Sequence, residues 1–270
     1  MKFICPKCAE NLIVQNGSAI CKNGHSYDRA RGGYYNLLLT SRGGVHGDNK
    51  EMVLARRAFL SAGYYAPLAR YLSFLVTEYL PRGGSVLDAG AGEGYYTDFI
   101  ERAIYERDGE SDVSAFDISK DAVREIGKKN PRISLAVAGS YHMPVADESF
   151  DCVINTFSPM ALEETRRVLK TGGHFIMAIP GEMHLFGLKE AIYETPYKNV
   201  VADTALEGFE LIEDEPLEYK IGLDSPEAIR SLFMMTPYAY RTRPQDREKV
   251  LSLDSLETKV DFRVFVYRKL

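Results

Sequence analysis

SVLDAGAGEGYYT, residues 85–97, is the stretch that decides the fold of this 270-residue chain. The apolar residues Val86 and Leu87 lead into Asp88, and an apolar helical pattern resumes at Tyr96. Between them lie three glycines at alternate positions, Gly90, Gly92 and Gly94. Glycines permit a sharp turn and let a ligand approach the backbone, and a helix amino terminus favours a negative group. The stretch therefore predicts a strand, a glycine turn and a helix that together face a ligand.

The glycine turn alone does not identify the ligand, because nicotinamide, flavin and S-adenosylmethionine (SAM) sites all use such turns. The next segment, DVSAFDISKDAVREI, predicts a second strand that ends at Asp117 and a helix capped by Ser119. An acid at the end of the second strand can accept hydrogen bonds from both ribose hydroxyls of a nucleoside cofactor. Asp117 is therefore a candidate cofactor ligand.

Strands and helices continue to alternate toward the carboxyl terminus. Residues 133–138 and 150–155 predict a third and a fourth strand, and ALEETRRVLKTGGHFIMAIP predicts a helix, a glycine turn and a fifth strand. GFELIEDEPLEY, from Gly208, and VDFRVFVY, residues 260–267, predict a final strand pair. The second of these places four apolar side chains on one face: Val260, Phe262, Val264 and Val266. Such alternation indicates a mostly parallel sheet with right-handed crossovers.

The order of these segments resembles the class I SAM-dependent methyltransferases over residues 85–180. The resemblance implies an α/β, Rossmann-like fold with a mostly parallel seven-stranded sheet. VLDAGAGEG is similar to the first motif of these enzymes, where Asp88 shapes the glycine loop around the methionine part of SAM. AFDIS is similar to the second, with Asp117 on the ribose, and AGSYHMPVADESFDCVI to the third and fourth, with residues 138–140 flanking the adenine. LKTGGHF resembles their late glycine turn, whereas a dehydrogenase more often has GxGxxG without the preceding aspartate.

The amino-terminal stretch CPKCAENLIVQNGSAICKNGH, residues 5–25, holds three of the four cysteines of the chain. A CxxC pair is followed by twelve residues, then by a cysteine and a histidine four positions later. Two short ligand pairs separated by about a dozen residues are typical of tetrahedral zinc sites. The expected ligands are Cys5, Cys8, Cys21 and His25. Two disulfides would need a fourth cysteine here, and reduced buried thiols would not cluster in this way.

Charge is distributed unevenly about residue 60. Residues 1–60 hold nine Lys or Arg and four Asp or Glu, a balance of +5, so with a total of -5 the remainder carries -10. Three thiolates and a neutral histidine around a zinc ion would lower the net charge of residues 1–60 by one, to +4. A basic appendage on an acidic body is the pattern expected when the appendage binds a polyanion. A merely solvated small module is the alternative.

Length and composition agree with one ordinary domain and a small appendage, since 45% of the 270 residues are hydrophobic. No stretch approaches the roughly 18 apolar residues of a membrane span, and the basic start has no signal-type apolar run after it. Free thiols without an export signal point to the reducing cytoplasm. Three divisions follow from these patterns: a zinc module at 1–35, a linker at 36–50 and a catalytic domain at 51–270.

Two other segments have more than one interpretation. GGVHGDNKEM, residues 43–52, predicts a flexible connection, and the helix after it carries a stripe of Leu68, Leu72, Leu75 and Tyr79 that fits a core face better than a recognition surface. FMMTPYAYRTRP, residues 233–244, has aromatic and arginine side chains that could contact a base or a phosphate. A helix end packed on the core is the equal alternative for this second segment.

The joint order of the amino-terminal ligand set, GGYYNLLL, ARRAFLSAGYYAPL, LDAGAGEGYYT and IPGEMHL resembles one particular family. It is similar to the bacterial 23S ribosomal RNA (guanine-N1)-methyltransferases with an amino-terminal zinc module, whose members include macrolide-resistance determinants. The resemblance spans nearly the full chain. It implies that the zinc module recognises ribosomal RNA, that the body binds SAM, that a homodimer forms the RNA cleft, and that Tyr65 closes over the cofactor. The residues it places on SAM are Tyr65, Asp88, Gly90, Gly92, Glu93, Gly94, Asp117, Ile118, Ser140, Asn155 and His184.

Guanine N1 carries a proton near neutral pH, so an acceptor must take the proton or orient the base. Asn155, in NTFSP after the fourth strand, and His184, in IPGEMHL after the fifth, are the candidates. NTFSP lacks the DPPY or NPPY signature of many exocyclic-amine methyltransferases, which agrees with a ring-nitrogen target. A helix-capping role is the alternative for His184. His142 and Glu182 fit a loop or surface role better, and Cys152 reads as a small core residue.

Three functional classes fit the sequence. The first is a methyltransferase of ribosomal RNA, and the second is a SAM-dependent enzyme for a small molecule or protein, with a structural zinc module. The third is a nucleic-acid-binding regulator that keeps SAM as a ligand without turnover. The charge distribution and the family resemblance favour the first class over the second. The intact glycines with Asp88 and Asp117 argue against the third class, which would not need all of them.

Overall fold

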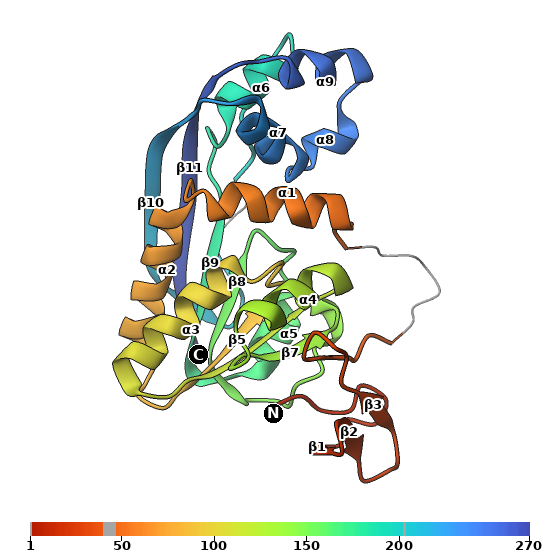
Figure 1. Cartoon of the computed structure of the whole chain (residues 1–270). Helices are drawn as coiled ribbons and strands as arrows, with labels where there is room; N and C mark the ends of the chain where they lie inside the picture. Colours follow the sequence, from red (N-terminus) through yellow and green to blue (C-terminus); the bar gives the residue numbers. More distant parts are fainter. Residues whose placement is uncertain (1, 40–46, 202–203) are drawn as a thin grey trace.

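In the computed structural model, residues 2–39, 47–201 and 204–270 are described. The body is built on one large sheet with the strand order β10-β11-β9-β8-β5-β6-β7-β4 (Figure 1). In the sheet order, the six strands β9, β8, β5, β6, β7 and β4 run parallel to one another, whereas β11 is antiparallel to both of its neighbours, β9 and β10. The strands are β4 (Tyr34–Asn36), β5 (Ser85–Ala89), β6 (Asp112–Asp117), β7 (Ser134–Val137), β8 (Phe150–Thr156), β9 (Leu169–Pro180), β10 (Phe209–Leu223) and β11 (Leu256–Lys269).

This order is that of a class I methyltransferase sheet with one strand added, so the expected fold class is confirmed. The added strand is β4, which pairs with β7 at the edge of the sheet. The expected count of seven strands was therefore one too low. A strand of three residues has no room for a recognisable alternation, and for this reason the sequence pattern did not reveal it.

Alternate side chains of the central strands enter two different cores. In β5, Val86 belongs to the core beneath α2, α3 and α4, whereas Leu87 and Ala89 belong to the core beneath α5 and the amino-terminal module. Every residue of β5 is buried, as expected for a parallel strand that is covered on both faces. The covering helices are α2 (Ala66–Tyr79), α3 (Tyr95–Asp108), α4 (Lys120–Lys129) and α5 (Leu162–Val168).

The expected core stripe of α2 is confirmed for Leu68, Leu72 and Leu75, which are buried, whereas its fourth member, Tyr79, is only half-buried against the core. On β11 the four side chains from Val260 to Val266 are buried as predicted, but Phe265 and Tyr267 on the opposite face are buried as well. The strand is therefore covered on both sides of this part of the sheet rather than on one.

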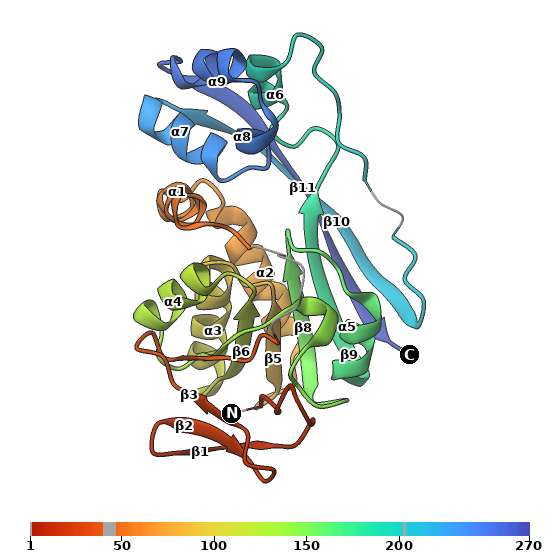
Figure 2. The same ribbon diagram turned by 90° about the vertical axis from the view of Figure 1, so that its right-hand side faces the viewer.

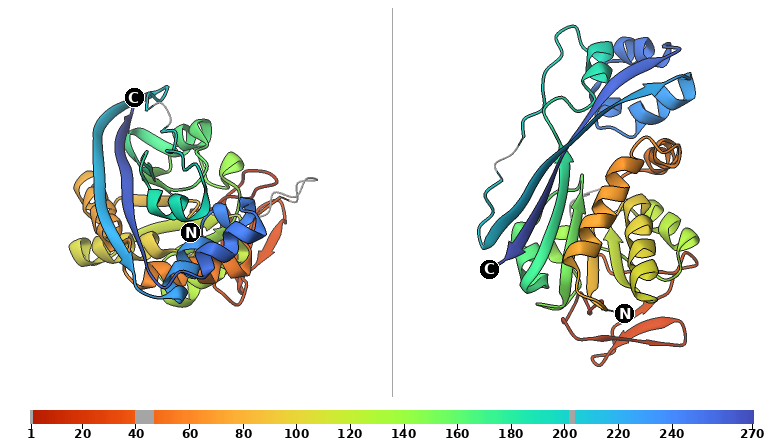
Figure 3. Two further views of the ribbon diagram at one scale, coloured as in Figure 1. Left: turned by 90° about the horizontal axis from the view of Figure 1, so that it is seen from above. Right: turned by 90° about the vertical axis from the view of Figure 1, so that its left-hand side faces the viewer.

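Two long strands carry a second group of helices away from the sheet (Figures 2 and 3). β11 pairs with β9 only from Phe262 to Arg268, whereas the β10–β11 pair continues to Leu223 and Leu256. We call these overhanging strand ends and the helices packed around them the upper lobe. Its helices are α6 (Phe186–Ile192), α7 (Pro226–Met234), α8 (Tyr238–Arg241) and α9 (Pro244–Leu251). Helix α1 (Lys50–Ser61) packs against α7 and so joins this lobe to the body.

The amino-terminal module is a three-stranded antiparallel sheet of β1 (Leu12–Gln15), β2 (Ser18–Cys21) and β3 (Ser26–Asp28). It is held on the body by backbone contacts, since the Ile4 nitrogen donates to the Pro144 oxygen at 2.8 Å and Phe3 bridges to Val145. β4 crosses the expected boundary at residue 35. The division into module, linker and catalytic domain remains a prediction.

The expected flexible connection is only partly described, because residues 43–46 lie outside the described residues. Its last three residues, Lys50 to Met52, are not a flexible segment but the first turn of α1. The helix begins here because the Asn49 side chain accepts a hydrogen bond from the Met52 nitrogen at 3.0 Å, which satisfies an otherwise unpaired donor. Among the described helices, none is long and apolar enough to cross a membrane.

Candidate functional site

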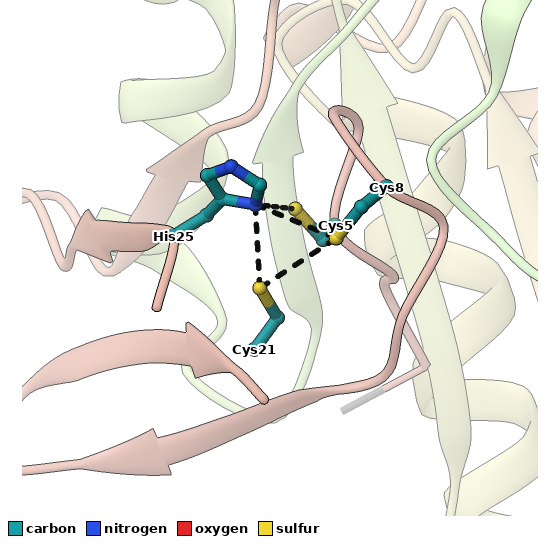
Figure 4. Close-up of side chains that lie close together, drawn as sticks. All are labelled: Cys5, Cys8, Cys21 and His25. Carbon is teal, nitrogen blue, oxygen red and sulfur yellow. Dashed lines mark hydrogen bonds between the residues drawn. The ribbon is translucent and has the colours of Figure 1, made fainter. Parts of the chain in front are cut away.

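The predicted zinc ligands are brought together at one end of the amino-terminal module (Figure 4). Cys5 and Cys8 lie on the turn before β1, Cys21 ends β2, and His25 precedes β3. Each of the three Sγ atoms lies 3.4 Å from Nδ1 of His25, and the Sγ atoms of Cys8 and Cys21 are 3.7 Å apart. None of the cysteines is in a disulfide.

These spacings fit a tetrahedral metal site. With zinc–sulfur and zinc–nitrogen bonds of about 2.3 and 2.1 Å, the edges of a regular tetrahedron are about 3.8 Å between sulfurs and about 3.6 Å between sulfur and nitrogen. Although burial opposes ionisation, hydrogen bonds from the Tyr27 hydroxyl and backbone amides lower the pKa of Cys5 to about 6. Burial and the neighbouring thiols raise the pKa of Cys21, so a cation is needed to stabilise all three thiolates together. The residues present therefore fit zinc.

The second site lies at the carboxyl ends of β5, β6 and β8, where the glycine turn begins. Gly90, Gly92 and Gly94 all have positive φ, and a Cβ added to Gly90 would collide with the hydroxyl of Ser158. The Gly92 nitrogen donates to Asp117 at 2.9 Å, and the Thr97 hydroxyl donates to Asp88 at 2.6 Å. The glycine turn is thus held between the two aspartates that the sequence singled out.

Several polar atoms near this turn are buried without a hydrogen-bond partner among the residues that the structure describes. They include Oδ1 of Asp88, Oε1 of Glu93, the Tyr96 hydroxyl and Oδ1 of Asn155. Asp88 and Glu93 are each 2% exposed. Leaving a buried polar atom unpaired costs about 1–3 kcal/mol, so the cluster is expected to be completed by a ligand that donates hydrogen bonds.

The charge of the site identifies the kind of ligand. Burial raises the pKa values of Asp88, Glu93 and Asp117. The pKa of Asp88 rises to about 7, because the negative charges of the other two acids add to the effect of burial. A pyrophosphate would be repelled by three carboxyl groups, whereas an ammonium and a sulfonium would be attracted. The glycine turn therefore fits SAM better than a dinucleotide.

A further part of the site lies at the ends of β6 and β7. Ser140 begins the 3-10 turn Ser140–His142 after β7, and Ile118 follows the strand that ends at Asp117. Gly47 approaches Ile118 and Ser119 so closely that a Cβ on it would overlap both residues. The Ser119 hydroxyl donates to the Asp48 oxygen at 2.7 Å. The chain that leads from the amino-terminal module therefore covers the edge where the adenine is expected.

Tyr65 and His184 meet on the other side of the glycine turn. The Tyr65 hydroxyl lies 3.2 Å from Nε2 of His184, and the Asp261 nitrogen donates to Nδ1 at 3.3 Å. Burial lowers the pKa of His184 to about 3, so its imidazole is neutral. The imidazole does not cap α6, whose first residue follows Leu185. The capping alternative for His184 is therefore not supported.

Two residues at this site, Arg56 and Phe157, were not found from the sequence. Arg56 of α1 pairs with Asp48 and lies 3.8 Å from the position of a Cβ on Gly92. Phe157 follows β8 in a left-handed conformation with φ of 55°, is 39% exposed, and lies next to the rings of Tyr65 and His184. The only sequence signals for these residues were their places in ARRAFL and NTFSP. Of the weaker candidates, His142 is exposed and Glu182 pairs with Lys198 on the surface, while Cys152 is fully buried in the core.

Comparison with known proteins gives matches to both parts of the chain. Residues 86–173 match a family described as "Methyltransferase domain", and residues 3–40 match one described as "RlmA, N-terminal". The 23S rRNA (guanine(748)-N(1))-methyltransferase of Streptomyces fradiae is 31% identical over 249 residues, which are 90% of this chain and 87% of that protein.

Two more relatives show the same pattern. A putative 23S rRNA (guanine-N(1)-)-methyltransferase of Micromonospora griseorubida is 32% identical over 89% of this chain and 87% of its own length. The putative 23S rRNA (guanine-N(1)-)-methyltransferase YxjB of Bacillus subtilis is 30% identical over 99% of this chain and 97% of its own length. The similarity therefore includes the amino-terminal module, the glycine turn and the upper lobe together.

Proposed function

Because the chain belongs to the family of 23S rRNA (guanine-N1)-methyltransferases, we propose that it transfers a methyl group from SAM to N1 of a guanine in a hairpin of 23S ribosomal RNA. The observation that carries the proposal is that one continuous similarity joins a Cys3His zinc module to a methyltransferase body. The cations of this module suit a polyanion. Lys7, Arg29 and Arg31 are in no ion pair among the described residues.

The cofactor site supports the proposal through its acceptors. SAM, when bound, would supply a methyl carbon on a positive sulfur, which guanine N1 would attack in line with release of S-adenosylhomocysteine. Asp88 and Glu93 would accept hydrogen bonds from the ammonium group through their unpaired oxygens. Asp117 would accept from the ribose, and Ile118 and Ser140 would lie against the adenine. The backbone of Gly90, Gly92 and Gly94 would contact the methionine part directly, because glycines have no side chain of their own.

The two candidates for handling the guanine proton have different surroundings. Both ring nitrogens of His184 are already used, by Tyr65 and by Asp261, so this residue orients Tyr65 over the cofactor rather than accepting a proton. The Asn155 amide donates weakly to the Ala89 and Pro159 oxygens at 3.4 Å, while its own oxygen has no partner. We therefore assign to Asn155 the role of accepting a hydrogen bond from the N–H edge of the target guanine.

Four narrower statements belong to the same proposal. The zinc module binds RNA, the enzyme processes ribosomal RNA in the cytoplasm, and it works as a homodimer whose two copies form the RNA cleft. Methylation at this position alters macrolide susceptibility. Sedimentation of the free protein tests the dimer, and drug susceptibility of a strain without the enzyme tests the fourth statement.

The proposal is tested by methyl transfer from labelled SAM to 23S rRNA transcripts, with the mark mapped to its nucleotide and ring position. We expect a guanine-N1 mark that is lost in Asp117→Ala and in the Cys5→Ala/Cys8→Ala double variant. Asp112→Ala is the matched control, because Asp112 begins the same strand but is exposed. If the wild type binds SAM but marks neither RNA nor ribosomal particles, the proposed substrate is wrong. A small-molecule or protein methyltransferase would then be the alternative.

A further inference from the structure

The upper lobe carries an aromatic and cationic surface that the chemistry at the cofactor site does not use. We define the tyrosine–arginine surface as Tyr193, Tyr197, Tyr240, Arg241 and Arg243, which lie on α8 and on the segments next to it and to α6. Tyr197 and Tyr240 are 54% and 53% exposed, and both arginines are exposed. A single exposed aromatic side chain needs no explanation, whereas several of them grouped with arginines mark an interaction site.

Tyr197 is held in place by a buried cation, and Tyr193 packs against Tyr197. Lys189 of α6 is completely buried, and its ammonium donates to the backbone carbonyl oxygen of Tyr197 at 2.8 Å and to Oδ1 of Asn199 at 2.6 Å. The same ammonium lies 4.4 Å from the centre of the Tyr197 ring. The Tyr193 ring lies 5.5 Å from Tyr197 and 6.4 Å from Tyr238 of α8. The rings are therefore ordered before any ligand arrives, which reduces the entropy lost on binding.

The two arginines of this surface are not neutralised. Two other exposed cations of the same lobe have acidic partners, since Arg230 pairs with Glu51 and Lys249 with Asp246. Arg241 and Arg243 are in no ion pair within the part of the chain that the structure describes, although the whole chain has more acids than bases. A guanidinium can bind a phosphate through two parallel hydrogen bonds, and exposed aromatic rings stack on unpaired bases.

The surface borders the cofactor site. Arg56, which lies beside Gly92, also donates to the Met235 oxygen at 3.4 Å, just before α8. On the same side, the Asn49 amide donates to the Tyr240 hydroxyl at 3.3 Å, and Asn49 is the cap of α1. Figure 2 shows α8 and α1 above the carboxyl ends of β5 and β6. A nucleic acid with one base at the glycine turn would therefore pass close to α8.

We propose that the tyrosine–arginine surface binds the nucleotides that flank the target guanine, with tyrosines stacked on unpaired bases and arginines on phosphates. The inference rests on the proposed function, because it takes RNA as the substrate. It goes beyond that function by placing RNA contacts on the catalytic body, apart from the zinc module. It also assigns both interpretations of residues 233–244 to different side chains: Phe233 and Ala239 belong to the core, and Tyr240, Arg241 and Arg243 to the recognition surface.

The test is a titration of labelled hairpin transcripts of 23S rRNA at several salt concentrations. Tyr197→Ala and Tyr240→Ala are each expected to weaken binding at least about fivefold, because stacking on one base is lost. Arg241→Ala/Arg243→Ala is expected to reduce the slope of log affinity against log salt by about 1.5, since two phosphate contacts are lost. The affinity for SAM stays unchanged in all three variants.

Matched controls come from the opposite part of the body. Tyr105 on α3 is 43% exposed, and the Arg82 side chain is 77% exposed, so Tyr105→Ala and Arg82→Ala remove the same groups outside the surface. Both controls should bind RNA within twofold of the wild type. If Tyr197→Ala does not fold, Tyr197→Leu keeps an apolar contact for the Lys189 stem while it removes the ring.

The outcomes separate the two proposals. If the wild type binds no ribosomal RNA, the proposed function fails, and this inference falls with it. If the wild type binds RNA but the surface variants behave like the controls, the function stands and the surface is wrongly assigned. If the surface variants change the sedimentation of the free protein but not its RNA affinity, the surface joins two copies of the chain, and the inference is overturned.

Discussion

The hydroxyl of Tyr65 lies 3.2 Å from Nε2 of His184. The hydrogen bonds of this imidazole show which of its two nitrogens carries the hydrogen. The Asp261 nitrogen can only donate, so Nδ1 of His184 must accept. A neutral imidazole then carries its hydrogen on Nε2 and donates it to Tyr65. The hydroxyl hydrogen of Tyr65 is left to point toward another acceptor, which would be the cofactor in the role proposed for this tyrosine.

The neutral state of His184 should appear in the pH dependence of stability. Its pKa is about 3 in the folded protein and 6.5 ordinarily, so the unfolded chain binds the extra proton between these values. Stability from this group is present above pH 6.5 and is lost as the pH falls toward 3. From pH 6.5 to 5.5 the loss should be about 1 kcal/mol in the free energy of unfolding.

Urea titrations at the two pH values measure this loss in the wild type, in His184→Gln and in His142→Gln. The His184→Gln variant should lack it. His142→Gln should keep it, because His142 is exposed. An identical loss in all three proteins would mean that His184 is not held neutral.

Binding of SAM should release a proton through Asp88. Its pKa is about 7 without ligand, and an ammonium beside its carboxylate would lower that pKa. The affinity for SAM should therefore rise with pH between 6 and 7, by up to about tenfold, and level off above pH 7.5. Calorimetry in two buffers of different ionisation enthalpy counts the released proton. Asp88→Asn should bind SAM more weakly and show no proton release, and a release that persists in this variant would assign the proton elsewhere.

Gly90 should be far less tolerant of alanine than another glycine of similar conformation. Gly90→Ala places a side chain at φ of 93° and against the Ser158 hydroxyl. Gly109 has φ of 79° but nothing within 4 Å of an added Cβ, so Gly109→Ala measures the backbone strain alone, about 1–2 kcal/mol. Thermal unfolding should show the larger loss for Gly90→Ala, and only that variant should lose SAM affinity. Equal losses would show that Ser158 simply moves aside.

One zinc ion should be bound per chain and should hold the amino-terminal module together. Cys8→Ala removes one of the four clustered ligands and should abolish stoichiometric zinc, because structural zinc sites contribute about 10 kcal/mol or more to folding. Atomic emission measures the metal, and limited proteolysis measures opening of residues 1–39. Cys152→Ala should keep full zinc, since that thiol lies in the sheet. A Cys8→Ala protein with one zinc per chain would exclude this ligand set.

Much of this architecture could be predicted from local patterns. The strands β5, β6 and β8 are short, mostly apolar segments with Asp88, Asp117 and Asn155 at or near their carboxyl ends, and such segments indicate buried parallel strands. The zinc ligands could be predicted because their spacing in the chain is itself the chemical requirement. The cap of α4 at Ser119 was predicted for a similar reason, since its bond to Ala122 is local.

The rest depends on contacts between distant residues. Arg56 reaches Met235 across 179 positions, and no local pattern distinguishes it from any other arginine on a helix. The positive φ of Phe157 arises where the chain turns after β8, and a phenylalanine is an unexpected residue for that conformation. The exposure of Tyr197 depends on how Lys189 is buried, which is a property of the assembled lobe.

The pairing of β4 with β7 has a consequence for the order in which the chain can fold during synthesis. Residues 34–36 leave the ribosome about a hundred residues before their partner strand at Ser134–Val137. The four zinc ligands are synthesised far earlier than β7, so the module can fold around the metal while β4 is still unpaired. A fragment that starts at residue 51 would lack this strand, would expose the hydrogen-bonding edge of β7, and would tend to self-associate. The amino-terminal segment that contains β4 therefore also protects the β7 edge of the catalytic sheet.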